Sequence, residues 1–144
     1  MANIIPDAFK LELLSGTHNF ASGGDTFKIA LYVTTLGPPY TTSSTAYSTT
    51  NEVSSSGTGY AAGGQALDGQ GVSGPGSNTA TVDFDNEVFS DVTLTSLGAA
   101  IYNSTNGSKL CLVIDFGGDK VATAGDFTIQ FPADAATTAI IQVA

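Results

Sequence analysis

The 144-residue chain is long enough for one domain that buries roughly two-thirds of its unfolded surface. Its 42% apolar content supports a real core and argues against wholesale disorder, while 17 glycines and few Glu, Lys or Arg residues favour strands and turns over helices. A net charge of −9, with four scattered lysines and no arginine, argues against nucleic acid as a partner.

The single cysteine, Cys111, leaves no intramolecular disulfide possible, so the stapled class of small secreted domains is excluded. The N-terminus lacks the basic and then apolar pattern of a signal peptide. No apolar run approaches the roughly 20 residues that span a bilayer. We therefore expect a soluble protein made in the cytosol, with one domain over residues 1–144 and no membrane partner.

Residues 1–18 are predicted to form a short helix or arm, with the helix itself from Ile4 to Leu14. Pro6 suits the first turn and Gly16 suits the C-terminal cap. Two alternatives stay open for the apolar stripe of this helix: packing on the sheet of its own domain, or docking on a neighbouring subunit. The stripe consists of Ile5, Phe9 and Leu13, with Leu14 beside them.

Strict alternation over Phe27–Val33 predicts an amphipathic strand. Residues 40–76 are rich in Gly, Ser and Thr and are predicted to form extended loops, with residues 59–65 as a short edge strand. Alternation returns over residues 78–84 and 88–94, which predicts two further strands.

The stretch from Gly98 to Phe131 holds three apolar runs closed by turn residues and is predicted to form an antiparallel meander. Asn106-Gly107 predicts a tight hairpin turn, because both residues tolerate positive φ. Leu110–Phe116 is predicted to be a central strand that ends at Gly117-Gly118, with Cys111 on its less buried face. With a last strand at residues 138–143, the chain is predicted to be mainly β, an antiparallel β-sandwich of jelly-roll type with seven to eight strands and one short N-terminal helix.

Few residues could carry catalysis. His18 is the only histidine, lies in no nucleophile motif and favours a structural role. Cys111 lacks a cluster of cationic neighbours that would activate a thiol, and one Cys with one His is too few for zinc. No glycine cluster is followed by the Lys-Ser/Thr pair of a phosphate loop. The sequence therefore predicts no catalytic residues, no cofactor and no enzymatic activity.

Calcium is the one metal that the sequence leaves to weigh, because hard cations take oxygen ligands. An acidic cluster surrounds a predicted turn, but its spacing does not match a helix–loop–helix calcium loop. A solvated polar rim, which discourages aggregation of strand edges, is the favoured interpretation. The candidate ligands are Asp83, Asp85, Glu87 and Asp91.

The order of segments resembles a family of small virion proteins of tailed bacteriophages, similar to capsid cement or decoration proteins. The resemblance covers nearly the whole chain and rests on NIIPDAFKLELLSGTHNF, DTFKIALY, TTNEVSSSGTGYAAGGQAL, GAAIYNSTNGSKLCLVIDFGGDK and FTIQFP. It implies a jelly-roll module on the outer surface of the head. It also implies two partners, the major capsid protein and the chain itself in a homodimer or homotrimer.

Two hypotheses about the function therefore remain open. The first is a structural cement protein that stabilises the head, where repetition over a symmetric lattice makes weak contacts sum to a large effect. The alternative is a tail- or fibre-associated module that binds a receptor or a glycan. The candidate interface residues are Ile5, Phe9 and Leu13 of the helix, together with Tyr40, Tyr47 and Tyr60.

Overall fold

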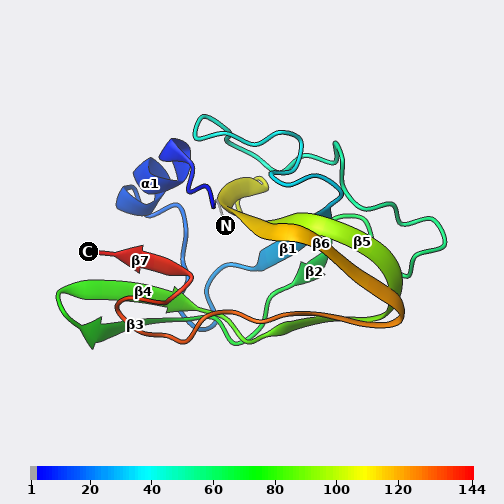
Figure 1. The fold of residues 1–144 in the computed structure, drawn as a ribbon. Coiled ribbons are helices and arrows are strands. Elements are labelled where there is room, and N and C mark those ends of the chain that lie inside the picture. Colours follow the sequence, from blue (N-terminus) through cyan, green and yellow to red (C-terminus); the bar gives the residue numbers. More distant parts are fainter. Residues whose placement is uncertain (1–2) are drawn as a thin grey trace.

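The computed structural model describes residues 3–144, which form two antiparallel sheets and one short helix (Figure 1). The mainly β architecture predicted from the alternating pattern is confirmed. The elements are α1 (Asp7–Leu14), β1 (Phe27–Tyr32), β2 (Gln65–Ala66), β3 (Gly71–Gly76), β4 (Thr79–Asp83), β5 (Glu87–Asn103), β6 (Lys109–Ile129) and β7 (Ile141–Val143).

The fold is organised around one long hairpin, β5–β6, which bends back over itself (Figure 1). Phe89 in the first half of β5 and Ile101 in its second half belong to the same core cluster, so the two halves face each other across the core. The bend lies where Ser96 pairs with Lys120 and Gly98 pairs with Asp115, because β6 carries extra residues there. An insertion of this kind kinks a strand and sharpens its twist.

Three strand predictions are corrected by this hairpin. Gly117-Gly118 does not end a strand: both glycines have positive φ and form the corner of a strand that continues to Ile129. The strand predicted at residues 88–94 and the first apolar run of the predicted meander, after Gly98, form one strand, β5. At the other end, the tight two-residue turn predicted at Asn106-Gly107 is a longer loop between Asn103 and Lys109.

The strand order in the larger sheet is β2-β1-β5-β6, and in the smaller sheet it is β3-β4-β7. The run Leu110–Phe116 was predicted to be central, but β6 is an edge strand and β1 and β5 are central. On its outer edge β6 is bridged only near its start, by Ala46 to Lys109 and by Ile4 to Val113 among the described residues. Beyond that point the edge of β6 has no strand partner in residues 3–144.

A bulge at Cys111 changes which side chains of β6 face the core. Tyr102 pairs with Leu110 and Ile101 pairs with Leu112, so Cys111 is an extra residue without a pair. As a result Leu112 joins the main core between the layers, whereas Leu110 packs on the opposite face of the sheet. Cys111 itself is 0% exposed, which corrects its predicted place on the less buried face.

That opposite face is covered by the segment between β1 and β2, which passes over the sheet as a third layer (Figure 1). Tyr40 packs there against Tyr32 and Tyr102. The predicted edge strand at residues 59–65 shrinks to the two residues of β2, and the supposed loop at residues 71–76 is strand β3. The part of the larger sheet formed by β1, residues 99–103 of β5 and residues 110–114 of β6 is therefore buried on both faces.

Helix α1 begins after Pro6 and ends in a glycine cap, as predicted, although it is shorter than the predicted span from Ile4. The Gly16 N–H donates to the Leu13 carbonyl and the Thr17 N–H donates to the Glu12 carbonyl, with Gly16 at φ 75°. This is the glycine-terminated motif that satisfies the last carbonyl groups of a helix. Ile4 precedes the helix and pairs with Val113 of β6.

Candidate functional site

The single histidine lies at the centre of a buried polar network. His18 Nε2 is 2.7 Å from a Glu12 carboxylate oxygen, and the other oxygen of Glu12 is 3.3 Å from Lys109 Nζ. On the opposite side, Asn103 Nδ2 donates to His18 Nδ1 at 3.0 Å and to Asp25 Oδ2 at 2.8 Å. The network ties α1, the segment after it and the end of the β5–β6 hairpin into one unit.

The network fixes the chemistry of its members. Because the Asn103 amide donates to Nδ1, His18 carries its proton on Nε2 and donates to Glu12. Cys111 Sγ lies 3.9 Å from Nδ1, but burial raises the pKa of the thiol far above its ordinary value. A thiol kept protonated and 0% exposed cannot reach a substrate, so this Cys–His pair is a packing contact.

Asp25 is the anionic end of the network. Partial burial raises the pKa of its carboxyl, but three hydrogen bonds more than offset that effect and leave the pKa below its ordinary value. The donors are the Asn19 backbone N–H and the side-chain amides of Asn103 and Asn106, at 2.9, 2.8 and 3.0 Å. The Asn106 amide also donates to the Thr17 carbonyl, so the hairpin loop is held against the segment after α1.

A second polar cluster surrounds Glu52 on the covered face of the sheet. Its carboxylate accepts hydrogen bonds from the Tyr47 and Tyr60 hydroxyl groups, each at 2.6 Å, and from the Gly63 N–H at 2.7 Å. The Tyr102 hydroxyl donates to the Gly63 carbonyl at 2.6 Å. Burial and the Glu52 charge raise the pKa of Tyr102 to about 12. The cluster anchors the third layer to the sheet.

These contacts locate the tyrosines that were candidate interface residues. Tyr40 and Tyr60 are 3% and 2% exposed, and their hydroxyl groups bond within the chain. Tyr47 is half-buried and stacks on Tyr102 with ring centroids 4.4 Å apart. The geometry therefore leaves no open aromatic platform from these three residues for a sugar ring.

The acidic residues weighed as calcium ligands, Asp83, Asp85, Glu87 and Asp91, do not gather into one group among the described residues. Asp85 donates its backbone N–H to the Asp68 carbonyl, and the buried Glu87 carboxylate accepts a hydrogen bond from the Gln65 amide. Burial raises the pKa of Glu87. Asp91 sits at a positive φ of 58°. Within residues 3–144, no three His, Cys, Asp or Glu side chains form a group that could hold a metal ion.

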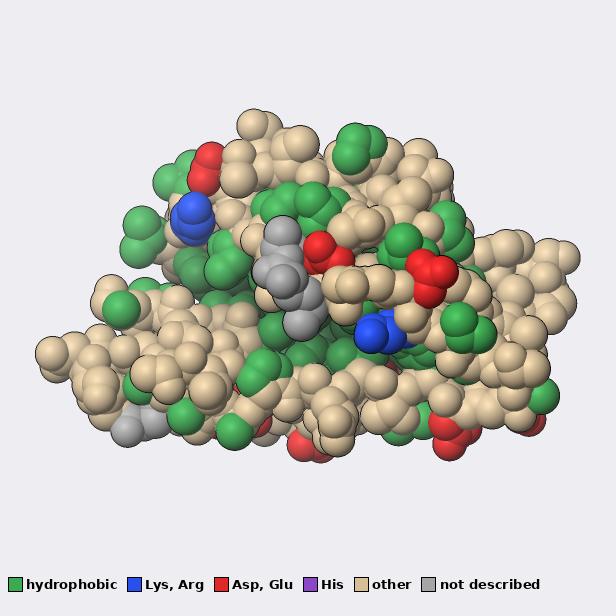
Figure 2. All heavy atoms as spheres, in the orientation of Figure 1, with side chains coloured by type: hydrophobic (Ala, Val, Ile, Leu, Met, Phe, Trp, Pro, Cys, Tyr) green, Lys and Arg blue, Asp and Glu red, His purple; other side chains and the backbone are tan. Residues whose placement is uncertain are grey.

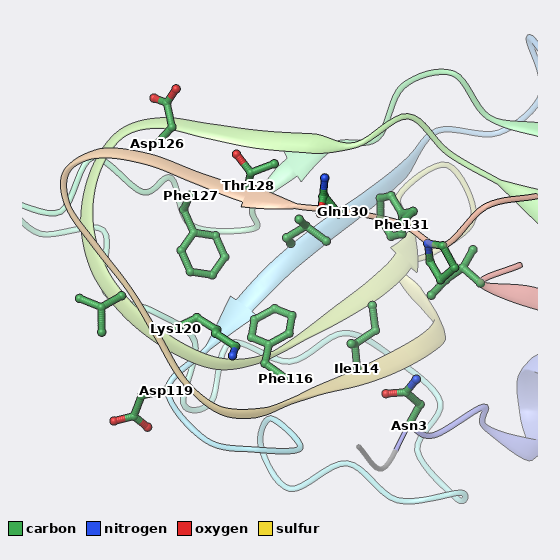
Figure 3. Close-up of a pocket in the computed structure, with 14 residues that line it drawn as sticks. Asn3, Ile114, Phe116, Asp119, Lys120, Asp126, Phe127, Thr128, Gln130 and Phe131 are labelled. Atoms are coloured by element: carbon green, nitrogen blue, oxygen red, sulfur yellow. The ribbon is translucent and has the colours of Figure 1, made fainter. Parts of the chain in front are cut away.

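A hollow lies along the open edge of β6, between the two layers. It has a volume of about 480 Å³, and Figure 3 shows β6 curving around it. Phe116 and Phe127 line it from the two halves of the strand, with ring centroids 6.1 Å apart. We call this hollow the open flank, and its apolar lining is Ile114, Phe116, Phe127, Ile129, Phe131 and Ile140.

The space-filling view shows apolar side chains exposed in the hollow between the layers (Figure 2). Ile114 and Ile129 are buried, at 8% and 7% exposed, whereas Phe116, at the end of the predicted run Leu110–Phe116, is only half-buried. The alternation of apolar residues in this part of the chain has the pattern of a core. It gave no signal that one side of the core stays uncovered.

Helix α1 presents a different apolar surface from the predicted stripe. Phe9 is 1% exposed and lies in the main core, and Ile5 and Leu13 pack partly buried against it. The exposed apolar side chains are instead Leu11 and Leu14, at 69% and 89%. The helix therefore packs on its own domain through the predicted stripe and leaves two leucines facing outward.

No protein-family model, curated protein or solved structure matches this chain. Within residues 3–144 no helix is both long and apolar enough to cross a membrane. The site geometry and the resemblance noted from the sequence are thus the grounds on which a function can be proposed.

Proposed function

We propose that this chain is a non-enzymatic structural protein of a tailed-bacteriophage virion. Its function is that of a capsid cement or decoration protein, which binds the outer surface of the major capsid protein lattice and stabilises the head. The order of sequence segments supports the virion family. The observation that carries a binding role is the open flank, because a concave and mostly apolar hollow with a few polar groups is the usual form of a binding site.

The placement of reactive groups supports a non-enzymatic role. His18 and Cys111 are buried and bonded within the fold, and the candidate tyrosines hold the third layer on the sheet. A net charge of −9 keeps the module away from packaged DNA and suits the capsid surface. Self-association as a homodimer or homotrimer is assigned to the outward face of α1, where Leu11 and Leu14 are exposed.

The alternative, a tail or fibre module that binds a receptor or a glycan, is less well supported because Tyr40 and Tyr60 are buried. Copy number separates the two functions. Gel densitometry of purified virions, with the major capsid protein as the internal standard, measures it directly. We expect hundreds of copies per particle, whereas a few tens would refute the cement function and favour the tail.

A second measurement tests binding. Heads assembled without this protein are mixed with the purified chain and sedimented, and the bound fraction is measured against concentration. Saturable binding that also raises the temperature at which heads rupture is the expected result. Heads that neither bind the chain nor gain stability from it would refute the proposal.

A further inference from the structure

The open flank has a mostly apolar lining that also includes the polar residues Asn3, Thr128 and Gln130 and one cation, Lys120. Lys120 extends beside the Phe116 ring, whereas Asp119 and Asp126 point away from the hollow (Figure 3). None of the ion pairs among the described residues involves Lys120. A mostly apolar cavity with one convergent polar group is the usual form of a recognition site.

The backbone around the flank disfavours an added strand. The edge of β6 is interrupted by positive φ angles at Gly117, Gly118 and Ala124, and its register with β5 shifts on both sides of Val92. Bulges and inward-pointing charges are the features by which natural sheets prevent edge-to-edge pairing. The flank is therefore suited to receive side chains from a partner, and not to pair with its backbone.

A second copy of the chain is also a poor occupant. Two flanks that face each other about a two-fold axis bring two Lys120 ammonium groups into one apolar hollow. Like charges in a desolvated contact are strongly unfavourable. The lining therefore favours a partner that carries both an apolar group and a negative charge.

We propose that the open flank binds a segment of another polypeptide that places an aromatic or aliphatic side chain between Phe116 and Phe127 and a carboxylate against Lys120. This inference rests on the proposed function, in which the segment belongs to the major capsid protein. The apolar side chain supplies most of the affinity by covering the half-buried Phe116, Phe131 and Ile140. The carboxylate supplies orientation, because it turns an unpaired ammonium group into a charge-assisted contact.

The first test uses anilinonaphthalene sulfonate, a fluorescent probe that combines aromatic rings with an anionic group. We expect saturable binding at one site, detected by fluorescence titration. Lys120→Glu should weaken it by about tenfold to a hundredfold, the equivalent of one lost charge-assisted contact. Lys10→Glu is the matched control, because Lys10 is exposed on α1 and does not line the flank, and its affinity should equal that of the native chain.

Lys120 lies on the surface, so its substitution should leave the fold intact, and circular dichroism checks this. A probe that does not saturate one site overturns the proposal. So does an equal loss of affinity in the Lys120→Glu and Lys10→Glu variants. Concentration-dependent dimers that Phe116→Arg converts to monomers would also overturn it, since a second copy would then be the occupant.

The same two lysine variants are then sedimented with undecorated heads. Loss of head binding in Lys120→Glu, with Lys10→Glu unchanged, supports the proposal. If Lys120→Glu loses the probe but binds heads as well as the native chain, the inference is refuted while the cement function stands. If the native chain binds the probe but not the heads, the cement function is refuted, and with it the assignment of the occupant to the capsid protein.

Discussion

Replacing Asn103 by alanine tests the buried network, because this one side chain holds together three parts of the chain. Its amide donates to His18 and Asp25, and its carbonyl oxygen accepts from the backbone N–H groups of Thr105 and Asn106. Asn103 is 0% exposed, so His18 Nδ1 loses its donor without gaining water, at about 1–3 kcal/mol. The bond to a charged carboxylate contributes about 1.5–3 kcal/mol more.

The expected loss is thus about 2.5–6 kcal/mol, the sum of these two contributions, because water replaces the Asn103 carbonyl at the loop without further cost. For a chain of 144 residues this corresponds to a fall in Tm of roughly 10 °C. Urea unfolding followed by circular dichroism measures it. Asn86→Ala is the matched control: Asn86 is exposed and accepts one bond, from the Phe131 N–H at 2.9 Å, so about 1 kcal/mol or less should be lost. Equal losses in the two variants would refute the structural role of the network.

Three further outcomes follow from the same structure. Gly64→Ala should lower the free energy of unfolding in urea by more than about 3 kcal/mol, because the added Cβ would meet the Ile29 carbonyl. Gly57 is the matched control, because it has a similar φ and open space around it. Gly57→Ala should therefore cost only about 1 kcal/mol, from backbone strain. The pKa values of all five tyrosines lie above 10 in the folded chain. The contribution of the unionised tyrosines to the free energy of unfolding is therefore complete below pH 10 and should fall as the pH rises above it. Absorbance titration of the folded chain should show no tyrosine ionising near pH 10. Asp25 has a lowered pKa, so its contribution is present above pH 4 and lost in more acid solution, and Asp25→Asn should flatten the pH dependence of unfolding there.

Local signals in the sequence were sufficient for the regular parts of the fold. Alternation placed the strand at Phe27–Tyr32 almost to the residue, and the glycine signal placed the end of α1. Both signals depend on neighbours in the chain, since side-chain period and cap geometry are properties of short segments. For the same reason the main β class was predictable from composition and pattern.

The errors arose where tertiary contacts override a local signal. Gly117-Gly118 has the composition of a turn, but its partner strand continues past it, so the pair forms a corner within β6. The unpaired Cys111 reverses the alternation around it, and a bulge depends on the register of the opposite strand. Neither event is visible in a single strand read alone.

The candidate sites show the same division. Chemistry was sought in His18, Cys111 and the acidic cluster, because those residue types carry it in other proteins. The open flank gives no distinct signal in the sequence because its lining has the pattern of core residues. Whether a core residue is covered depends on which strand lies at the edge of the sheet, and the sequence does not state the order of strands in the sheet.

The distribution of polar and apolar groups follows one physical rule in this molecule. The polar networks around His18 and Glu52 lie where irregular segments cross the larger sheet, and there they satisfy backbone and side-chain groups that regular strands cannot reach. The apolar lining of β6 lacks such a cover, and its bulged edge together with Lys120 blocks pairing with another sheet. An apolar surface protected against strand pairing but open to inserted side chains has the properties of a specific docking site. Under the proposed cement function, those properties suit a module that must not aggregate before it binds the capsid.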